Sequence, residues 1–140
     1  MDKALYYLAL ARKAGRAELG EEPVGAVARA LKAHLIMVAS DASDHTWRRG
    51  KSYVAGTKQQ CVRVPFTKDE LGLAIGRQSL AVAALTDASM ALAFLQSLPD
   101  QKPYASEMQV LQEKVEHDRL RAKEAKVHQR NVRKGKVKKN

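Results

Sequence analysis

The chain has 140 residues, a formal net charge of +10 and one cysteine. This length fits one compact domain with an appendage. A lone cysteine excludes an internal disulfide and a cysteine-based zinc site, so the cytoplasm is the expected compartment. No segment approaches the roughly 20 apolar residues that a membrane-spanning helix needs, and the first residues lack a secretory cleavage signal. We therefore expect a soluble, unprocessed protein without a membrane partner.

The first elements follow from helical spacing and from glycine. Apolar residues predict a helix that begins after the cap Asp2 and ends at Gly15. A short strand follows at 17–19. Gly20 then opens a second helix, and Pro23 suits its first turn because that position needs no N–H donor.

The middle of the chain predicts a buried strand. The continuous apolar run at 34–39 is typical of a central strand buried on both faces. A helical stretch follows through about residue 53, although Gly50 lowers its helical propensity. A short strand is expected at 61–64. The candidate caps of the helical stretch are Ser40, Asp41 and Ser43.

The next segment contains a capping box at Thr67 and Glu70, in which each side chain can bond to the amide of the other residue. The short helix that it starts is expected to end at Gly76. A last strand is predicted at 80–85, and Asp87 caps the helix after it. Because strands and helices alternate throughout, we predict an α/β fold with helices on both faces of a layered sheet.

Positive charge is concentrated beyond this domain. Residues 1–100 carry 13 basic and 10 acidic side chains, whereas residues 101–140 carry 12 basic and 5 acidic ones. We therefore divide the chain into a folded domain at 1–100 and a basic extension at 101–140. A basic excess of this kind indicates a polyanionic partner such as nucleic acid.

The extension begins with a weak apolar stripe and then becomes charged. From Arg119 onward, 10 basic residues stand against one acidic residue, Glu124. Such a block cannot bury enough apolar surface to fold by itself, so we expect a fraying helix that leads into a disordered basic end. The stripe itself consists of Tyr104, Met108, Leu111 and Val115.

No enzyme motif is complete in the sequence. Gly50-Lys51-Ser52 is similar to the end of a phosphate-binding loop, but His45 stands where the first glycine is required. The four histidines lack the spacing of metal ligands. Cys61 lies in a predicted buried strand, so we interpret it as a packed thiol. Glu21 and Glu22 diverge on a helix and lack a nearby nucleophile. We predict a non-catalytic protein with no metal and no cofactor.

Four segments carry a family resemblance. They are Gly20-Glu21-Glu22 at a helix start, LIMVASD at 35–41, FTKDELGLAIG at 66–76 and AVAALTD at 81–87. Together they resemble the ribosomal protein L7Ae family, most closely its small stand-alone bacterial members. The similarity covers residues 4 to about 98 in unbroken order and leaves the basic extension outside.

The resemblance implies a three-layer α/β/α fold with a four-stranded mixed sheet. It also implies binding of structured RNA, above all ribosomal RNA and often kink-turns, with ribosomal or assembly proteins as further partners. Two loops contact RNA in the family, and they correspond here to the turn Gly20–Val24 and the loop Gly76–Ala81. The RNA-binding residues that we predict are Gly20, Glu21, Glu22, Arg29, Lys32, Arg77, Gln78, Ser79 and Leu80.

The first loop also departs from the archaeal pattern. There, the glycine is followed by Asn two positions on, Glu three on and Lys six on, whereas this chain has Glu22, Pro23 and Ala26. RNA binding is therefore still predicted, whereas the sequence leaves open whether kink-turn specificity is retained. The lost positive charge could be replaced by residues that we expect near the loops, namely Lys13, Arg16, Arg29, Lys32 and Arg77.

Other functions remain open at this point. A protein-interaction adaptor is the alternative, because the 104–118 stripe could pack on a partner helix. An RNA methyltransferase is disfavoured because the chain has no room for a second catalytic domain. Trp47 could stack on a base, but a lone tryptophan on a helix more often packs against its own domain.

Overall fold

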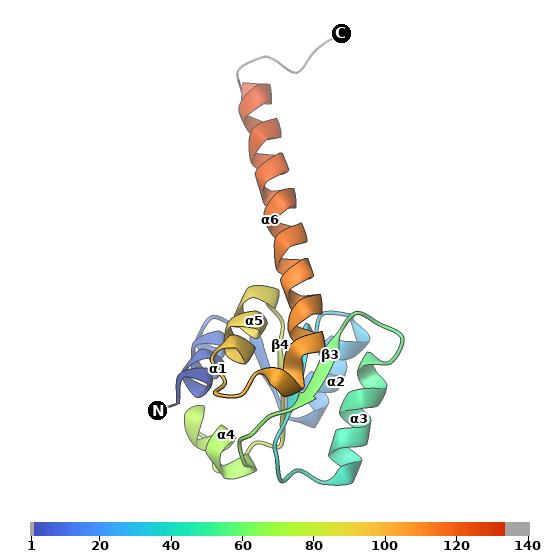
Figure 1. Cartoon of the computed structure of the whole chain (residues 1–140), viewed down its shortest axis with the longest axis vertical. Coiled ribbons are helices and arrows are strands. Elements are labelled where there is room, and N and C mark those ends of the chain that lie inside the picture. Colours follow the sequence, from blue (N-terminus) through green and yellow to red (C-terminus); the bar gives the residue numbers. More distant parts are fainter. Residues whose placement is uncertain (1, 134–140) are drawn as a thin grey trace.

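A computed structural model describes residues 2–133 of the chain, and Figure 1 shows a body of alternating helices and strands from which one long helix projects. The helices and strands are α1 (Lys3–Lys13), β1 (Ala17–Leu19), α2 (Glu21–Arg29), β2 (Leu35–Val38), α3 (Asp44–Val54), β3 (Gln60–Arg63), α4 (Lys68–Ala74), β4 (Val82–Leu85), α5 (Ala88–Gln96), a single 3-10 turn (Lys102–Tyr104) and α6 (Ala105–Arg133).

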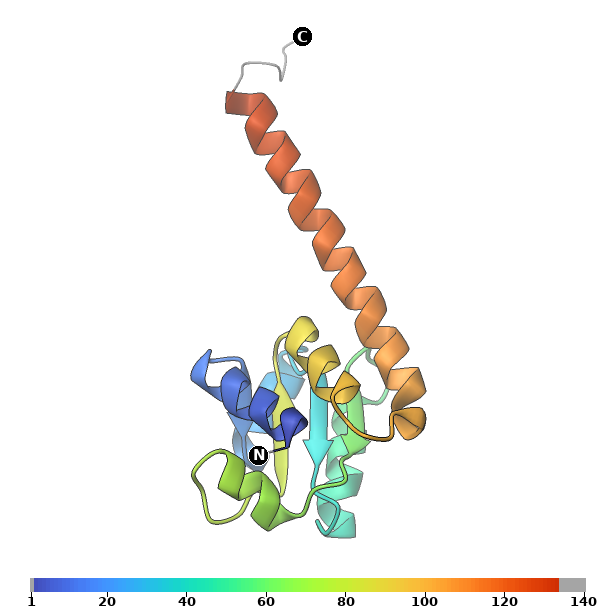
Figure 2. The same cartoon turned by 60° about the vertical axis from the view of Figure 1, so that its left-hand side comes forward.

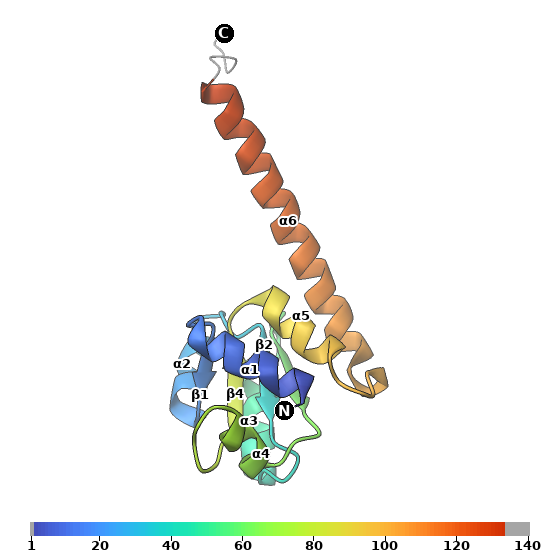
Figure 3. The same ribbon diagram turned by 90° about the vertical axis from the view of Figure 1, so that its left-hand side faces the viewer.

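The sheet is mixed and has the strand order β1-β4-β2-β3. Strand β4 pairs antiparallel with both β1 and β2, whereas β2 and β3 are parallel and are joined through α3. Helices α1, α4 and α5 cover one face, and α2 and α3 cover the other (Figures 2 and 3). The predicted α/β/α fold with a four-stranded mixed sheet is confirmed.

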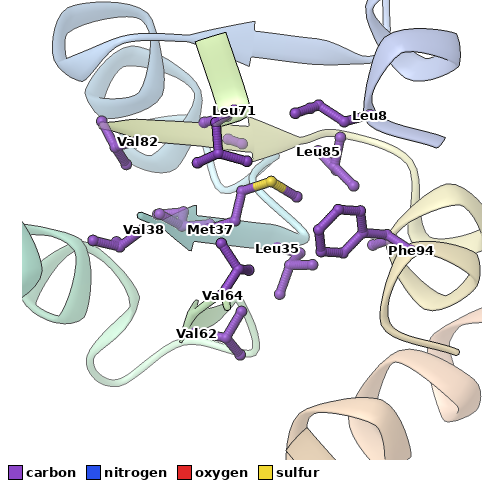
Figure 4. Packing of buried hydrophobic residues seen from close by; sticks show 14 of the residues in the cluster. Leu8, Leu35, Met37, Val38, Val62, Val64, Leu71, Val82, Leu85 and Phe94 are labelled. Atoms are coloured by element: carbon purple, nitrogen blue, oxygen red, sulfur yellow. The ribbon is translucent and has the colours of Figure 1, made fainter. Parts of the chain in front are cut away.

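The core has two sides because side chains alternate across each strand. Met37 and Leu35 point toward α1, α4 and α5, where Leu8, Leu71 and Phe94 meet them (Figure 4). Their neighbours on the strand face α2 and α3 instead. All four residues of β2 are buried, as the unbroken apolar run predicted.

Most predicted helix starts are confirmed. Asp2 accepts a hydrogen bond from the amide of Ala4 at 2.9 Å, and the capping box of Thr67 is complete. Of the three candidate caps for α3, Ser43 is the one used. Asp41 instead accepts a 2.8 Å hydrogen bond from the amide of Lys68, which ties the β2–α3 connection to α4.

Gly50 does not interrupt α3, because it lies where the helix approaches β3 most closely. A β-carbon at Gly50 would come within 2.9 Å of Cys61 Sγ and 3.4 Å of Val38 Cγ2. The missing side chain therefore allows close packing of helix on sheet, and this contact outweighs the low helical propensity of glycine.

Of the two forms expected for the tail, helical or disordered, residues 119–133 take the helical one and continue α6 without a break. Arg, Lys, Ala and Glu dominate this stretch and are good helix formers even without burial. Residues 134–140, where the basic end was expected to be disordered, lie outside the described part of the chain.

The base of α6 belongs to the core. Leu111 is completely buried, and Tyr104 is nearly so. The hydroxyl of Tyr104 donates a 3.0 Å hydrogen bond to the carbonyl of Arg63 at the end of β3. The domain boundary at residue 100 stays a prediction, since residues on its far side pack into the same hydrophobic cluster.

We expect Leu111→Ala to lower the free energy of unfolding by about 2 to 5 kcal/mol, because it removes a fully buried leucine from the core. Leu120→Ala, the same change on the same helix at a side chain that is 53% exposed, should cost less than about 0.5 kcal/mol. Urea denaturation measures both. Equal losses would mean that the base of α6 does not contribute to the core.

His34 joins α6 to the body and gives stability a pH dependence. Its Nδ1 lies 3.3 Å from Nζ of Lys114, and burial followed by the Lys114 charge lowers the pKa of His34. The folded-state pKa of His34 lies below the unfolded value of about 6.5, so the fold favours the neutral form of this histidine. The contribution of neutral His34 to the free energy of unfolding is therefore complete above about pH 6.5. It is lost as pH falls through the folded-state pKa.

We therefore expect acid to lower the melting temperature more in the wild type than in His34→Gln, which cannot titrate at this position. His128→Gln, which changes an exposed histidine on α6, is the control. Thermal melts between pH 5 and 8 test the difference. Parallel pH curves for wild type and His34→Gln would contradict the assignment.

Candidate nucleic-acid interface

The turn from β1 into α2 is built around Gly20. This residue has φ 96° and ψ 166°, a region that is essentially restricted to glycine. Its amide donates a 2.9 Å hydrogen bond to the carbonyl of Val82 on β4. No side chain caps the first turn of α2, and Glu21 and Glu22 in that turn are exposed.

The loop before β4 is held by the end of α4. Gly76 has φ 73°, and the amide of Arg77 donates a 2.8 Å hydrogen bond to the carbonyl of Gly72. A β-carbon at Gly72 would lie only 2.7 Å from the amide nitrogen of Ser79. The loop therefore lies directly on α4, and only glycine at position 72 permits this approach.

The turn and the loop lie side by side at one end of the sheet. Leu19 pairs with Ala83 in the antiparallel register of β1 and β4, and Gly20 follows with its bond to Val82. The amide of Ala39 donates to the carbonyl of Ala81 at 2.9 Å on the other side of β4. This end, where β1, β2 and β3 finish and β4 begins, is called the loop end below.

Most of the predicted RNA-binding residues lie at the loop end with exposed side chains. These are Glu21, Glu22, Arg77, Gln78 and Ser79.

Three predictions need correction. Leu80 is only 3% exposed, so its side chain belongs to the core and not to the surface. Lys32 lies between α2 and β2, hence at the opposite end of the sheet. Arg16, expected near the loops as a source of charge, lies at that opposite end as well, because its carbonyl accepts from the amide of Thr86 after β4. The direction of the strands places Lys32 and Arg16 at the end of the sheet that is far from the two loops.

Arg29 is on the last turn of α2, but its guanidinium is directed back along the helix. It passes within 3.1 Å of the position that a β-carbon of Gly25 would occupy. Together with Glu21, Glu22, Arg49 and Tyr53 it lines a hollow of about 270 Å³ between α2 and α3.

Arg49 is a residue that the sequence did not indicate. Its Nε lies 3.9 Å from a carboxylate oxygen of Glu21, and both side chains are about half exposed. An ion pair this open to solvent adds little stability. The ion pair matters for its location. Through it, α3 contributes a cation beside the Gly20–Val24 turn, which is distant from Arg49 in the sequence.

The loop end is rich in carboxylates. Its connections, together with the first turns of α2, α3 and α4, carry six exposed carboxylates against two cations, Lys68 and Arg77. Two further cations reach this end from α3 and β3, namely Arg49 and Arg63. A surface of this kind can accept hydrogen bonds from base N–H groups but attracts phosphate weakly. The six carboxylates belong to Glu21, Glu22, Asp41, Asp44, Asp69 and Glu70.

Trp47 and Cys61 do not offer reactive or stacking groups at this site. Trp47 is half-buried against the core, and Lys51 Nζ and Arg63 Cζ lie 5.4 Å and 5.1 Å from its ring centroid. Burial raises the pKa of the Cys61 thiol to about 12, so it stays protonated at neutral pH.

Two kinds of feature are absent from residues 2–133. Among them, the structure shows no helix long and apolar enough to cross a membrane. It also gathers no group of three or more His, Cys, Asp or Glu side chains suited to a metal ion.

Comparison with known proteins finds solved structures with a similar fold. No protein-family model matches the sequence, and no curated protein matches it. A solved structure of a protein of unknown function from Bacillus halodurans has a TM-score of 0.65 and 25% identity, and the match covers 71% of this chain and 100% of that one. The Giardia lamblia 15.5 kD RNA-binding protein has a TM-score of 0.56 and 16% identity, over 66% of this chain and 79% of that one. The chain therefore shares its fold with an RNA-binding protein.

We expect Gly20→Ala to lower the free energy of unfolding by about 1 to 3 kcal/mol, because alanine is strained at this φ and ψ. Gly15→Ala is the matched control. Space for a methyl group is ample at both positions, but Gly15 occupies the common left-handed helix cap at φ 70°. Chemical denaturation should show a smaller loss for the control, and equal losses would contradict the role of the Gly20 conformation.

Proposed function

We propose that this chain is a non-catalytic RNA-binding protein that contacts structured RNA with the loop end of its sheet. The observation that carries the proposal is the juxtaposition of the Gly20–Val24 turn and the Gly76–Ala81 loop. Two glycines with positive φ, Gly20 in the turn and Gly76 in the loop that leads into β4, bring exposed backbone and polar side chains together on one surface. The fold shared with the Giardia RNA-binding protein supports this assignment.

The chemistry of the loop end suits base recognition. Gly20 lets the backbone approach a ligand closely, and the carboxylates of Glu21 and Glu22 can accept hydrogen bonds from guanine N–H groups. Arg77 can neutralise a phosphate from the second loop. Guanines with accessible edges occur where an RNA helix is distorted, and a distorted helix, including a kink-turn in ribosomal RNA, is therefore the proposed ligand.

The basic extension adds affinity for phosphate under this proposal. Cations that touch phosphates raise the affinity for every RNA and make it fall as salt rises. Titrations of a kink-turn RNA and a plain duplex of equal length, each at several salt concentrations, test the function. No binding of either RNA would overturn it, and association with a protein without salt dependence would favour the adaptor.

We expect Glu22→Ala to change the ratio of the affinities for the kink-turn and duplex RNAs by at least about fivefold, because a hydrogen bond from a base to a carboxylate is worth about 1.5 to 3 kcal/mol. Glu124→Ala removes the same charge from the exposed part of α6, and it should strengthen binding of both RNAs alike. If the two variants alter both RNAs in parallel, Glu22 acts only through its charge.

A further inference from the structure

The two ends of the sheet carry opposite charge. The connections that precede β1, β2 and β3 each hold one exposed cation, namely Arg16, Lys32 and Lys58. Asp87 is the one carboxylate of the connections at this end, and its side chain caps α5 through the amide of Met90. Helix α6 adds Glu113 and Asp118, which line a hollow here together with Lys58 and Lys114. The end where β1, β2 and β3 begin, called the strand-start end below, therefore attracts phosphate, in contrast to the carboxylate-rich loop end.

Helix α6 leaves the body at this same strand-start end. The contact between Lys114 and His34, which directly precedes β2, fixes the point of departure. Beyond it, all side chains from 116 to 130 are exposed, and the helix projects away from the loop end (Figures 1 to 3). At 1.5 Å per residue, the stretch 119–133 adds about 21 Å.

One face of α6 changes from apolar to cationic where the helix leaves the body. Met108, Leu111 and Val115 pack on the core at helical spacing. The same face continues outward with cations at intervals of three or four residues, which places about one on each turn. These four exposed cations, called the α6 stripe, are Arg119, Lys123, Lys126 and Arg130.

Repulsion within the α6 stripe destabilises the helix unless a ligand of opposite charge neutralises the four cations. Like charges three or four residues apart on a helix repel each other, and acidic partners are few. The one described ion pair within α6 joins Arg119 to Glu116 at 3.5 Å, with both side chains largely exposed. A straight row of cations on a helix that stands clear of the body is complementary to the phosphates along a nucleic-acid strand.

We propose that the α6 stripe, with Arg16, Lys32 and Lys58, is a second RNA-binding site that contacts the phosphate backbone without regard to sequence. The inference rests on the proposed function and extends it: the protein holds two RNA segments, one at each end of the sheet. The strands separate the two ends by about 13 Å, and α6 extends farther in the opposite direction. Most of the α6 stripe therefore lies well away from the loop end, and the proposal assigns a separate RNA segment to each site.

A matched pair of variants tests the stripe in the full-length protein. Arg121 and Arg130 are nine residues apart, which at about 100° per residue places them on opposite sides of α6. Arg130→Gln should lower the slope of log affinity against log salt for a plain RNA duplex by up to about 0.9, and Arg121→Gln should leave it nearly unchanged. Equal effects of the two variants would overturn a specific stripe.

A bridging experiment tests the two sites together. A kink-turn RNA and a plain duplex with different fluorescent labels are mixed with the protein, and sedimentation identifies a complex of one protein with both RNAs. The variant with all four stripe residues changed to Gln should still bind the kink-turn RNA but should no longer recruit the duplex.

The outcomes separate the two proposals. Binding of single RNAs without a ternary complex, or recruitment of the duplex by the stripe variant as by wild type, would overturn the second site and leave the proposed function intact. Failure of the wild type to bind any RNA would overturn the proposed function.

Discussion

Strand β4 lies between β1 and β2 and runs antiparallel to both, and this pairing assigns every connection to one of the two ends of the sheet. The hydrogen bonds from Gly20 to Val82 and from Ala39 to Ala81 continue the pairing beyond the strands themselves. They place the turn into α2 beside the loop before β4. Reversing the direction of this one strand would separate the two loops by the length of the sheet.

The same strand pairing places acidic and basic side chains at opposite ends of the sheet. Acidic side chains collect at the loop end, most of them in the first turns of α2, α3 and α4, where a carboxylate is stabilised by the helix dipole. Cations stand in the connections at the strand-start end. The preference of carboxylates for the first turns of helices thus contributes to the charge difference between the two ends, and a phosphate-rich ligand meets very different surfaces there.

Helix α6 depends on its base. Tyr104 and Leu111 anchor the first turns in the core, and Lys114 contacts His34 at the strand-start end of the sheet. Helix nucleation is the unfavourable step in forming an isolated helix, and a docked base supplies a nucleus that the exposed turns extend. The direction in which the charged part of α6 points is therefore set by a few buried contacts far from the charges.

The sequence by itself determined the element order, because apolar periodicity and capping residues act locally. Asp2, Thr67 with Glu70, and Asp87 start their helices as predicted, and the apolar run 34–39 gave a strand buried on both faces. The family resemblance supplied the mixed sheet. Local patterns also placed Gly20 at the turn, since the residue that begins a helix after a short strand must change chain direction.

Only the tertiary structure decided which distant residues share a surface. Lys32 and Arg16 were expected near the loops, but strand direction puts them at the other end, and Leu80 is buried although its neighbours are exposed. Arg49 reaches Glu21 only because α3 packs beside α2. These features arise from packing between elements, and no local pattern in the sequence encodes that packing directly.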